Sequence, residues 1–382
     1  MQAHPTHRRF PQATALALTC LAAALSSSVA PANTVQWLLG AHGAWDDPAN
    51  WQDGQVPGVN DVAFIPSGGA GVAIAGVVHV AGLQLGEGSS LAVAQGGTLN
   101  LHGDTILNGR LTNAGRLNWI GGRLRVTNTT GDPLAVLPAT GEIDNNAQAI
   151  FDIQCDGTME SGYGQEPFVN SGSLIKSAGN GTATLGLQFS GNGVMDAQQG
   201  TVALSGGGGV SGHYQAEAGA AIHFSGGSFT LGANPDFHAG DEVWFTGGEV
   251  TITATLANLT LRGSDLAGGL QFITGTCVMQ GGKLLGDESL AGLLEWHQGT
   301  VDSGCSLTVL SSGTLRIYEG LGVFGLLTNA GNIEWQSGGI TLFHNAGSLG
   351  SIINQSGGVF DANSTDNSWI TGYWGGEDFS NA

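Results

Sequence analysis

Apolar and polar residues alternate in short runs along most of the chain, and a glycine-rich turn follows each run. The unit reads LNWIGGRL at Leu117–Leu124 and VWFTGGEV at Val243–Val250. Further copies occur at Ile222–Phe229, Leu294–Val301 and Ile333–Ile340. Strict alternation over so few residues is typical of a strand with one buried face, and glycine pairs are typical of turns. The pattern therefore predicts many short strands joined by tight turns.

The units recur at a regular step. Gly226, Gly247 and Gly268 are 21 residues apart, and Gly338 and Gly357 are 19 residues apart. A step of this length holds two or three short strands with their turns. Stacking such coils about 4.8 Å apart buries an apolar face that a single coil would expose. We therefore predict an all-β fold, a right-handed parallel β-helix.

A longer repeat lies over this short one. The segment GRLTNAGRLNW at Gly109–Trp119 returns as GLLTNAGNIEW at Gly325–Trp335, 216 residues later. The segment Asn145–Ser171 returns, with changes, at Asn354–Ala382. A unit of about 210 residues is thus repeated in tandem, and its second copy is incomplete. We expect the chain to be a piece of a longer protein.

The first 32 residues have the features of a secretory leader. Arg8 and Arg9 precede a short apolar run at Ala13–Leu25, and Ala30-Pro31-Ala32 fits a small-x-small cleavage site. We predict a signal peptide at residues 1–32, cleaved after Ala32, and a secreted or cell-surface location. An uncleaved membrane anchor is the alternative, but the run is shorter than the roughly 20 residues of a span. No membrane span is expected in the mature chain.

Two stretches resemble known bacterial surface proteins. The tryptophan-rich stretch Trp37–Ile74 resembles the opening of large secreted and autotransporter-like proteins. The stretch Phe168–Gly227 is similar to the repeats of bacterial surface β-helix proteins. The resemblance implies a short β-cap at residues 33–66, a β-helical stalk at residues 67–382, and an adhesin-like surface role. It also implies an extracellular polysaccharide, or the surface of a host or neighbouring cell, as partner.

The charge of the chain excludes some partners. Lys and Arg number 10 against 30 Asp and Glu, and charged residues make up only 10% of the chain. Nucleic acids and anionic membranes are poor partners, because neutralising phosphates requires clustered Lys and Arg. Lyases on this fold use a basic residue beside carboxylates. Four of the basic residues lie within Arg110–Arg125, a stretch without any carboxylate, so a lyase is disfavoured.

The alternative to a structural role is a carbohydrate-active enzyme. A hydrolase needs two carboxylates flanking one glycosidic bond, and Asp152, Asp156 and Glu160 are the candidate catalytic residues. A second acidic cluster occupies the same place in the long repeat: Asp361, Asp366, Glu377 and Asp378. Recurrence in tandem favours solvated loops over a single active site, so we expect a non-enzymatic protein. No cofactor is expected, although calcium bound by these loops stays open.

Aromatic residues fall into two groups. Trp119, Trp296 and Trp335 share one place in the coil unit, two positions after an aliphatic residue. Alternation puts such residues on the same face of a strand, so these tryptophans are predicted to lie in the core. A polar, glycine-rich stretch carries the predicted ligand-contact residues, which are Trp369, Tyr373 and Trp374.

Cysteine and histidine add little. Three cysteines follow the leader, Cys155, Cys277 and Cys305, and an odd number excludes a complete disulfide framework. Pairing of Cys277 with Cys305 and burial as small apolar side chains both remain open. The histidines have no zinc-binding spacing, so no metal site is predicted.

Overall fold

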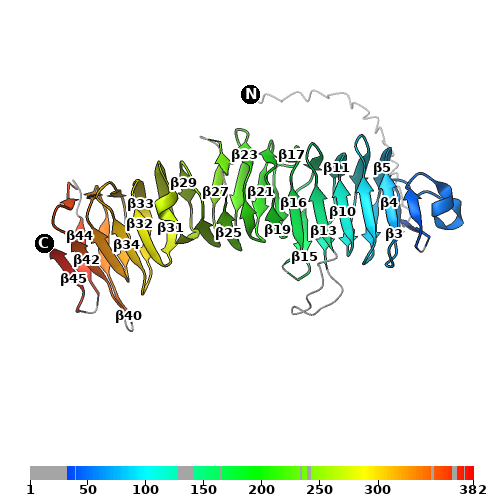
Figure 1. The fold of residues 1–382 in the computed structure, drawn as a ribbon. Coiled ribbons are helices and arrows are strands. Elements are labelled where there is room, and N and C mark those ends of the chain that lie inside the picture. Colours follow the sequence, from blue (N-terminus) through cyan, green and yellow to red (C-terminus); the bar gives the residue numbers. More distant parts are fainter. Residues whose placement is uncertain are drawn as a thin grey trace, which may run out of the picture. The chain divides into compact units, whose positions relative to one another are not determined.

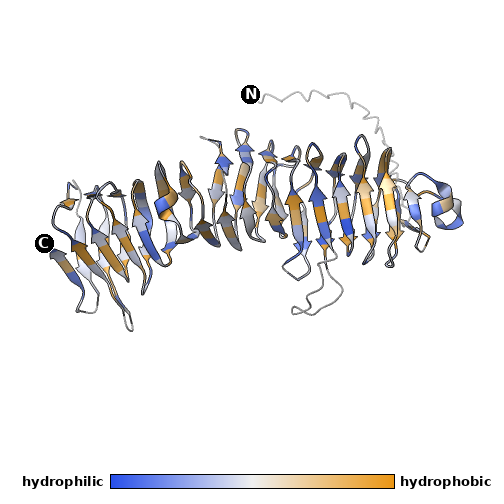
Figure 2. Ribbon diagram, viewed as in Figure 1, coloured by the Kyte–Doolittle hydropathy of each residue, from blue (hydrophilic) through white to orange (hydrophobic). Residues whose placement is uncertain are grey.

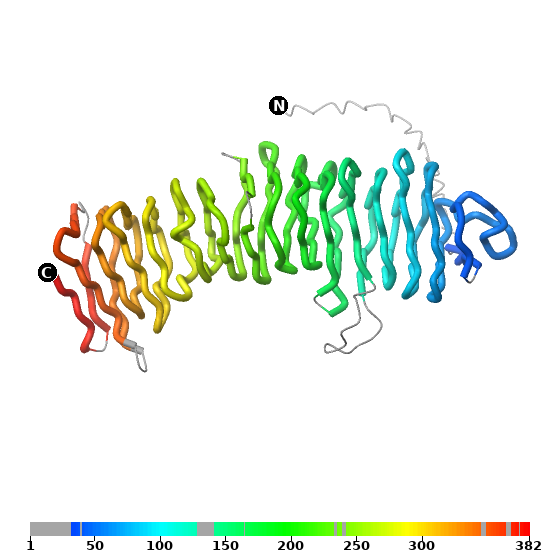
Figure 3. The backbone as a smooth tube through the Cα atoms, in the orientation of Figure 1, coloured from blue at the N-terminus to red at the C-terminus, as the bar shows by residue number. Residues whose placement is uncertain are grey.

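The computed structural model describes residues 32–38, 40–127, 141–163, 165–232, 235–238, 242–345, 348–363, 368–373 and 375–382. The predicted signal peptide, apart from Ala32, lies outside the described residues. From Ala32 to Ala382 the chain forms one unit, a right-handed parallel β-helix, as the alternation predicted (Figure 1). The backbone tube in Figure 3 shows the successive coils stacked side by side.

A complete coil has three faces. The strands of the first face are β1 (Asn33–Gln36), β3 (Asp61–Ile65), β6 (Gly82–Leu85), β9 (Thr105–Leu107), β12 (Leu124–Val126), β15 (Thr158–Ser161), β18 (Thr182–Leu185), β21 (Thr201–Leu204), β24 (Ala221–Phe224), β27 (Val243–Phe245), β29 (Leu259–Leu261), β31 (Thr276–Leu284), β33 (Leu293–Val301), β35 (Thr314–Ile317), β38 (Asn332–Trp335) and β43 (Val359–Asp361). The strands of the second face are β2 (His42–Ala44), β4 (Gly71–Ile74), β7 (Ser90–Val93), β10 (Arg110–Asn113), β13 (Glu142–Asn145), β16 (Pro167–Asn170), β19 (Gln188–Ser190), β22 (Gly208–Val210), β25 (Ser228–Leu231), β28 (Glu249–Ile252), β30 (Asp265–Gly268), β36 (Leu321–Val323), β39 (Gly339–Leu342) and β44 (Trp369–Gly372).

The third face consists of two separate sheets. The first contains β5 (Val77–Val80), β8 (Thr98–Leu101), β11 (Arg116–Trp119), β14 (Ile150–Ile153), β17 (Ser173–Lys176), β20 (Val194–Ala197), β23 (His213–Ala216) and β26 (Asp236–Phe237). The second contains β32 (Asp287–Leu290), β34 (Ser306–Val309), β37 (Leu326–Asn329), β42 (Ser351–Asn354) and β45 (Asp378–Asn381). A small side hairpin pairs β40 (His344–Asn345) with β41 (Ser348–Leu349), and the short helices are η1 (Pro48–Asn50), η2 (Gln52–Gly54) and η3 (Leu270–Phe272).

Apolar side chains of successive coils stack in columns that fill the interior. On the second face Leu111 pairs with Leu91 of one neighbouring coil and with Ile143 of the other, and Leu91, Leu111 and Ile143 are fully buried. Figure 2 shows the alternation of apolar and polar residues along the strands. Burial of each large apolar side chain contributes roughly 1.5–3 kcal/mol.

The tryptophans of the coil unit lie in this core. Trp119 and Trp296 have no exposed surface, and Trp335 is 6% exposed. The prediction that these residues point inward is confirmed.

Buried asparagines join the coils at one corner. Asn113 donates its amide to Oδ1 of Asn145, and Asn145 donates to Oδ1 of Asn170, both at 2.8 Å. Each amide also donates to a backbone carbonyl of the next coil, those of Ile150 and Ser173 in the first two cases. These amides thus add side-chain hydrogen bonds between successive coils at the corner, where a buried amide needs partners for its own polar atoms. This ladder was not predicted from the sequence.

The long repeat builds the same corner on a different edge of the solenoid. Asn329, the counterpart of Asn113, donates to Asn354, which donates to Asn381. The first ladder lies where the second face meets the third, between β10 and β11. The second lies where the third face meets the first, between β37 and β38. The sequence repeat therefore reproduces a local corner rather than a fixed position around the axis.

Irregular coils between the two copies accompany this change of edge. Helix η3 and an isolated bridge from Leu256 to Ile273 stand where the third face lacks strands. The next two coils contain the nine-residue strands β31 and β33, which run through the first and second faces with register shifts. The coils thus differ in how many residues each face and turn takes up.

Residues 33–66 contain a cluster of three tryptophans. Trp51 packs edge-to-face against Trp37 and Trp45, with ring centroids 4.9 Å and 4.8 Å apart, and its indole nitrogen donates to the Trp45 carbonyl at 2.6 Å. Strands β1 and β2 of this segment pair in parallel with β3 and β4, so they extend the sheets of the first complete coil by one strand each.

Among the described residues, no helix is both long and apolar enough to cross a membrane.

Candidate functional site

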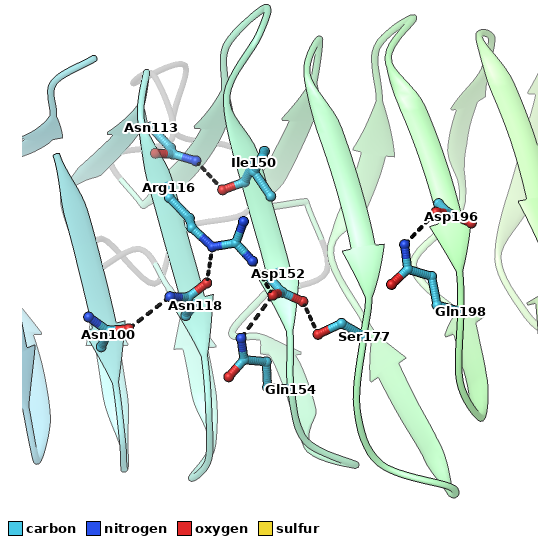
Figure 4. Close-up of polar contacts among 10 residues, drawn as sticks. All are labelled: Asn100, Asn113, Arg116, Asn118, Ile150, Asp152, Gln154, Ser177, Asp196 and Gln198. Carbon is cyan, nitrogen blue, oxygen red and sulfur yellow. Dashed lines mark hydrogen bonds and ion pairs between the residues drawn. The ribbon is translucent and has the colours of Figure 1, made fainter. Parts of the chain in front are cut away.

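The carboxylate of Asp152 is buried on the outer side of the third face. Asp152 is 1% exposed, and its oxygens accept hydrogen bonds from Ser177 Oγ at 2.7 Å and Gln154 Nε2 at 2.8 Å. The Arg116 guanidinium of the preceding coil lies 2.5 Å away (Figure 4). A carboxylate with these three partners has little capacity left for a substrate.

A polar row continues from Arg116 along the same face. Arg116 Nε donates to Oδ1 of Asn118, and the Asn118 amide donates to Asn100, both at 2.8 Å (Figure 4). Asn100 in turn donates to the carbonyl of Val78. Asn100 and Asn118 are only 5% and 8% exposed, so the row links successive coils instead of presenting free groups to solvent.

Asp156 lies in the turn after β14 and accepts a hydrogen bond from Lys176 Nζ at 2.8 Å. This hydrogen bond is the main reason that the pKa of Asp156 lies below its usual value. Lys176 is fully buried and also donates to the carbonyls of Ala178 and Gly179 at 2.7 Å and 3.1 Å. The ammonium group therefore occupies the centre of two stacked turns, as a bound cation would.

Glu160 lies on β15 of the first face, with Arg123 of the preceding coil 3.9 Å away. The three candidate catalytic carboxylates are thus placed on the third face, in a turn and on the first face. Each has its own cationic partner, and the structure shows no hydrogen bond that joins any two of them. A glycosidase uses two carboxyl groups on either side of one bond, whereas each of these three is engaged by a cation of a neighbouring coil.

The predicted contact residues lie on the surface of the last coils. Trp369 and Tyr373 are 57% and 58% exposed, while Trp374 lies outside the described residues. Trp369 pairs in register with Gly339 of the preceding coil, and its ring lies over that glycine: a Cβ at Gly339 would be 3.0 Å from the indole. The ring fills the gap that the missing side chain leaves.

Tyr373 belongs to a ladder of aromatic rings that sequence reasoning missed. Phe324 stacks on Phe343 at 4.2 Å between centroids, and Phe343 lies 5.7 Å from Tyr373. Each of these residues directly follows a second-face strand, and this recurring position is the signal that would have identified the ladder. We name Phe324, Phe343, Trp369 and Tyr373 the aromatic patch.

A charged row on the outer first face was also missed. Arg316 Nε lies 2.7 Å from Glu334 of the next coil, and Nη1 lies 3.2 Å from Glu295 of the preceding coil. The hydrogen bond to Glu334 raises the pKa of Arg316. Each of the three residues is the outward-facing polar residue between two inward-facing residues of the coil unit. Because they share this position, they are expected to lie next to one another on stacked strands.

Cys155, Cys277 and Cys305, the three cysteines among the described residues, are free thiols. Cys277 is buried, and burial raises the pKa of its thiol to about 12. Within the described part of the chain, no group of three or more His, Cys, Asp or Glu side chains is arranged to hold a metal ion.

Comparison with protein-family models, with curated protein sequences and with solved structures finds no match to the chain.

Proposed function

We propose that the chain is a non-enzymatic, extracellular structural segment of a bacterial surface protein, an adhesin-like stalk that is exported after cleavage near Ala32. One observation carries the proposal: each ion pair between described residues joins neighbouring coils. The pairs are Arg110–Glu142, Arg110–Asp144, Arg116–Asp152, Arg123–Glu160, Lys176–Asp156, His213–Asp236, Lys283–Asp302, Arg316–Glu295 and Arg316–Glu334.

This use of charge suits a load-bearing rod. Charged residues are scarce in this chain, and an enzyme would be expected to gather several of them in one cleft. Here they are distributed along the stack and cross-link one coil to the next. Exposed pairs contribute at most about 1 kcal/mol each, so they strengthen modestly the junctions that they span. The net charge of −20 also disfavours association between copies.

The aromatic patch supports the adhesive part of the proposal. Two of its members, Trp369 and Tyr373, are more than half exposed; Tyr373 packs against Phe343, which stacks on Phe324, and Trp369 lies over Gly339. Flat apolar rings with a polar atom at one edge are suited to contacts that are partly wet. Extracellular polysaccharide, or a cell surface that carries it, is the partner that we propose for this array.

The test separates binding from hydrolysis. The purified chain is incubated with insoluble pectin, alginate and chitin, and both the bound protein and the released reducing ends are measured. We expect binding to at least one polymer without release of sugar. The double variant Trp369→Ala/Tyr373→Ala should bind at least tenfold more weakly. Tyr163→Ala, which removes an aromatic side chain that is 56% exposed, should bind as the wild type does.

Two outcomes would overturn the proposal in different ways. Release of sugar that is lost in Asp156→Asn would show a carbohydrate-active enzyme, the alternative function. Binding that Trp369→Ala/Tyr373→Ala leaves unchanged would remove the aromatic patch as the contact surface.

A further inference from the structure

Two histidines of neighbouring coils face each other on the outer side of the third face. His79 lies on β5, and His102 directly follows β8 of the next coil. Nδ1 of His79 is 3.1 Å from Nε2 of His102, and the ring centroids are 5.4 Å apart with planes inclined by 31°. Both side chains are exposed to solvent. The two nitrogens therefore meet at the surface, where a dissolved ion reaches them without any rearrangement of the core.

The separation of these nitrogens matches a shared metal ion. In the neutral pair one of these nitrogens donates its proton to the lone pair of the other. When that proton moves to the second nitrogen of its own ring, the new tautomer presents two lone pairs to a cation. With metal–nitrogen bonds of about 2.1 Å, a nitrogen separation of 3.1 Å corresponds to an angle at the metal of about 95°. This angle is close to the right angle between adjacent ligands in square-planar or octahedral complexes. A tetrahedral ion would require the nitrogens to lie somewhat farther apart, at about 3.4 Å.

We propose that His79 and His102 form a two-histidine binding site for a divalent transition metal, with Cu²⁺ bound more tightly than Ni²⁺ or Zn²⁺. Imidazole nitrogen suits all three ions, and the general order of affinity places Cu²⁺ first. The hard cations Ca²⁺ and Mg²⁺ prefer oxygen ligands and should not bind here. The preference for Cu²⁺ also follows from the angle, since Cu²⁺ favours tetragonal geometry.

The surroundings leave the other coordination positions open. His79 is also at the edge of a hollow of about 550 Å³ between the tryptophan cluster and the first coil, whose wall includes Trp45, Val59 and Val77. This wall is mainly apolar and has one carboxylate, that of Asp46. Water or an external ligand would complete the coordination, because two histidines alone leave positions free in a four- or six-coordinate complex.

The other histidines provide matched controls. His297 stacks on Tyr318, with centroids 4.8 Å apart and planes inclined by 13°. His223 stacks in a similar way on Trp244. His297 therefore has an aromatic partner in place of a second imidazole, and removing it should not affect the proposed site.

The experiment measures metal binding by the untagged full chain. Isothermal titration with CuCl₂, NiCl₂, ZnCl₂ and CaCl₂ is carried out at pH 7.5, and electron paramagnetic resonance reports the nitrogen ligands of bound Cu²⁺. We expect one Cu²⁺ per chain, with two nitrogen ligands in the spectrum. His79→Ala and His102→Ala should each weaken Cu²⁺ binding at least tenfold, while His297→Ala should have no effect.

Two further measurements keep the result interpretable. Repeating the titration in a Cys155→Ser/Cys305→Ser background removes the two half-exposed thiols as competing ligands. Circular dichroism of each histidine variant reports whether the β-helix is intact. Equal binding by the wild type and by folded His79→Ala and His102→Ala chains would overturn the proposal, as would preferential binding of Ca²⁺ at this site.

Discussion

Asp152 and Arg116 form an ion pair between adjacent coils, 2.5 Å apart, in which the carboxylate is almost completely buried. Removing one partner of a buried pair leaves the other charge without compensation, which typically costs about 3–5 kcal/mol. Arg116 is itself 38% exposed, so we expect a cost at or just below the lower end of that range. Arg116→Ala should therefore lower the free energy of unfolding by about 2–3 kcal/mol.

The matched control for this prediction is Arg110→Ala. Arg110 also pairs with carboxylates of the next coil, but its side chain is 58% exposed. Exposed pairs contribute about 0–1 kcal/mol, so this variant should unfold close to the wild type in urea. Equal losses of stability in the two variants would contradict the distinction between the buried and the exposed pair.

Features that depend on a single strand could be predicted from the sequence, whereas contacts between coils could not. Alternation within a strand assigned Trp119, Trp296 and Trp335 to the core, because the side-chain period of a strand depends only on the strand itself. The pairing of Arg116 with Asp152 was not predictable in the same way. The two residues are 36 positions apart, well beyond one 20-residue step, since the coil between them includes a longer connection. Which residues become neighbours depends on how many residues each turn absorbs.

The same argument applies to the asparagine ladder. The ladder partners are 32 residues apart for Asn113 and Asn145, and 25 residues apart for Asn145 and Asn170. No fixed period relates them, although the LTNAG motif repeats clearly. The motif predicts a recurring local structure, but the edge of the solenoid on which it lies depends on all the intervening coils.

Disrupting the middle of this ladder should destabilise the protein. Asn145 accepts one hydrogen bond from Asn113 and donates to Asn170 and to the Ser173 carbonyl. Asn145→Ala removes these three hydrogen bonds from a buried corner and should cost about 2–4 kcal/mol. Asn145→Asp should cost more, because it places a carboxylate against two acceptors. Thermal denaturation of both variants tests this order, and an aspartate variant as stable as wild type would refute the assigned hydrogen-bond directions.

Lys176 provides a prediction that depends on pH. Its hydrogen bond lowers the pKa of Asp156 in the folded protein, so folding favours the ionised carboxylate. The resulting stability is present above the unfolded pKa of about 4 and is lost as the pH falls through the lower folded value. Lys176→Met removes the partner and should abolish this acid-dependent loss.

The same variant should also be less stable at neutral pH. Lys176→Met leaves the carbonyls of Ala178 and Gly179 without their donor, and each unsatisfied buried group costs about 1–3 kcal/mol. Comparing the melting temperatures of both proteins between pH 2.5 and pH 7 separates the two effects. A variant whose melting temperature falls in acid as steeply as that of wild type would show that the Lys176–Asp156 pair is not the source.

Glu288 should have the opposite pH dependence. This residue points into the core from β32, is 3% exposed, and accepts a hydrogen bond from the backbone nitrogen of Leu270 at 2.8 Å. Burial is the main cause that raises its pKa, so the folded protein binds the proton more tightly than the unfolded chain does. Stability is therefore greatest below the unfolded pKa of about 4.3 and falls as the pH rises through the folded value.

Glu288→Gln keeps an acceptor for Leu270 and removes the charge. At pH 7 the variant should be more stable than wild type by an amount on the order of 1 kcal/mol, and the difference should vanish near pH 4. Glu288→Ala removes the acceptor as well and should be destabilised at both pH values, because the amide at the start of η3 loses its partner. Melting temperatures of the wild type and both variants at pH 4 and pH 7 test these predictions. A Glu288→Gln variant that is less stable than wild type at pH 7 would contradict the prediction. It would show that a contact other than the hydrogen bond from Leu270 compensates the buried charge.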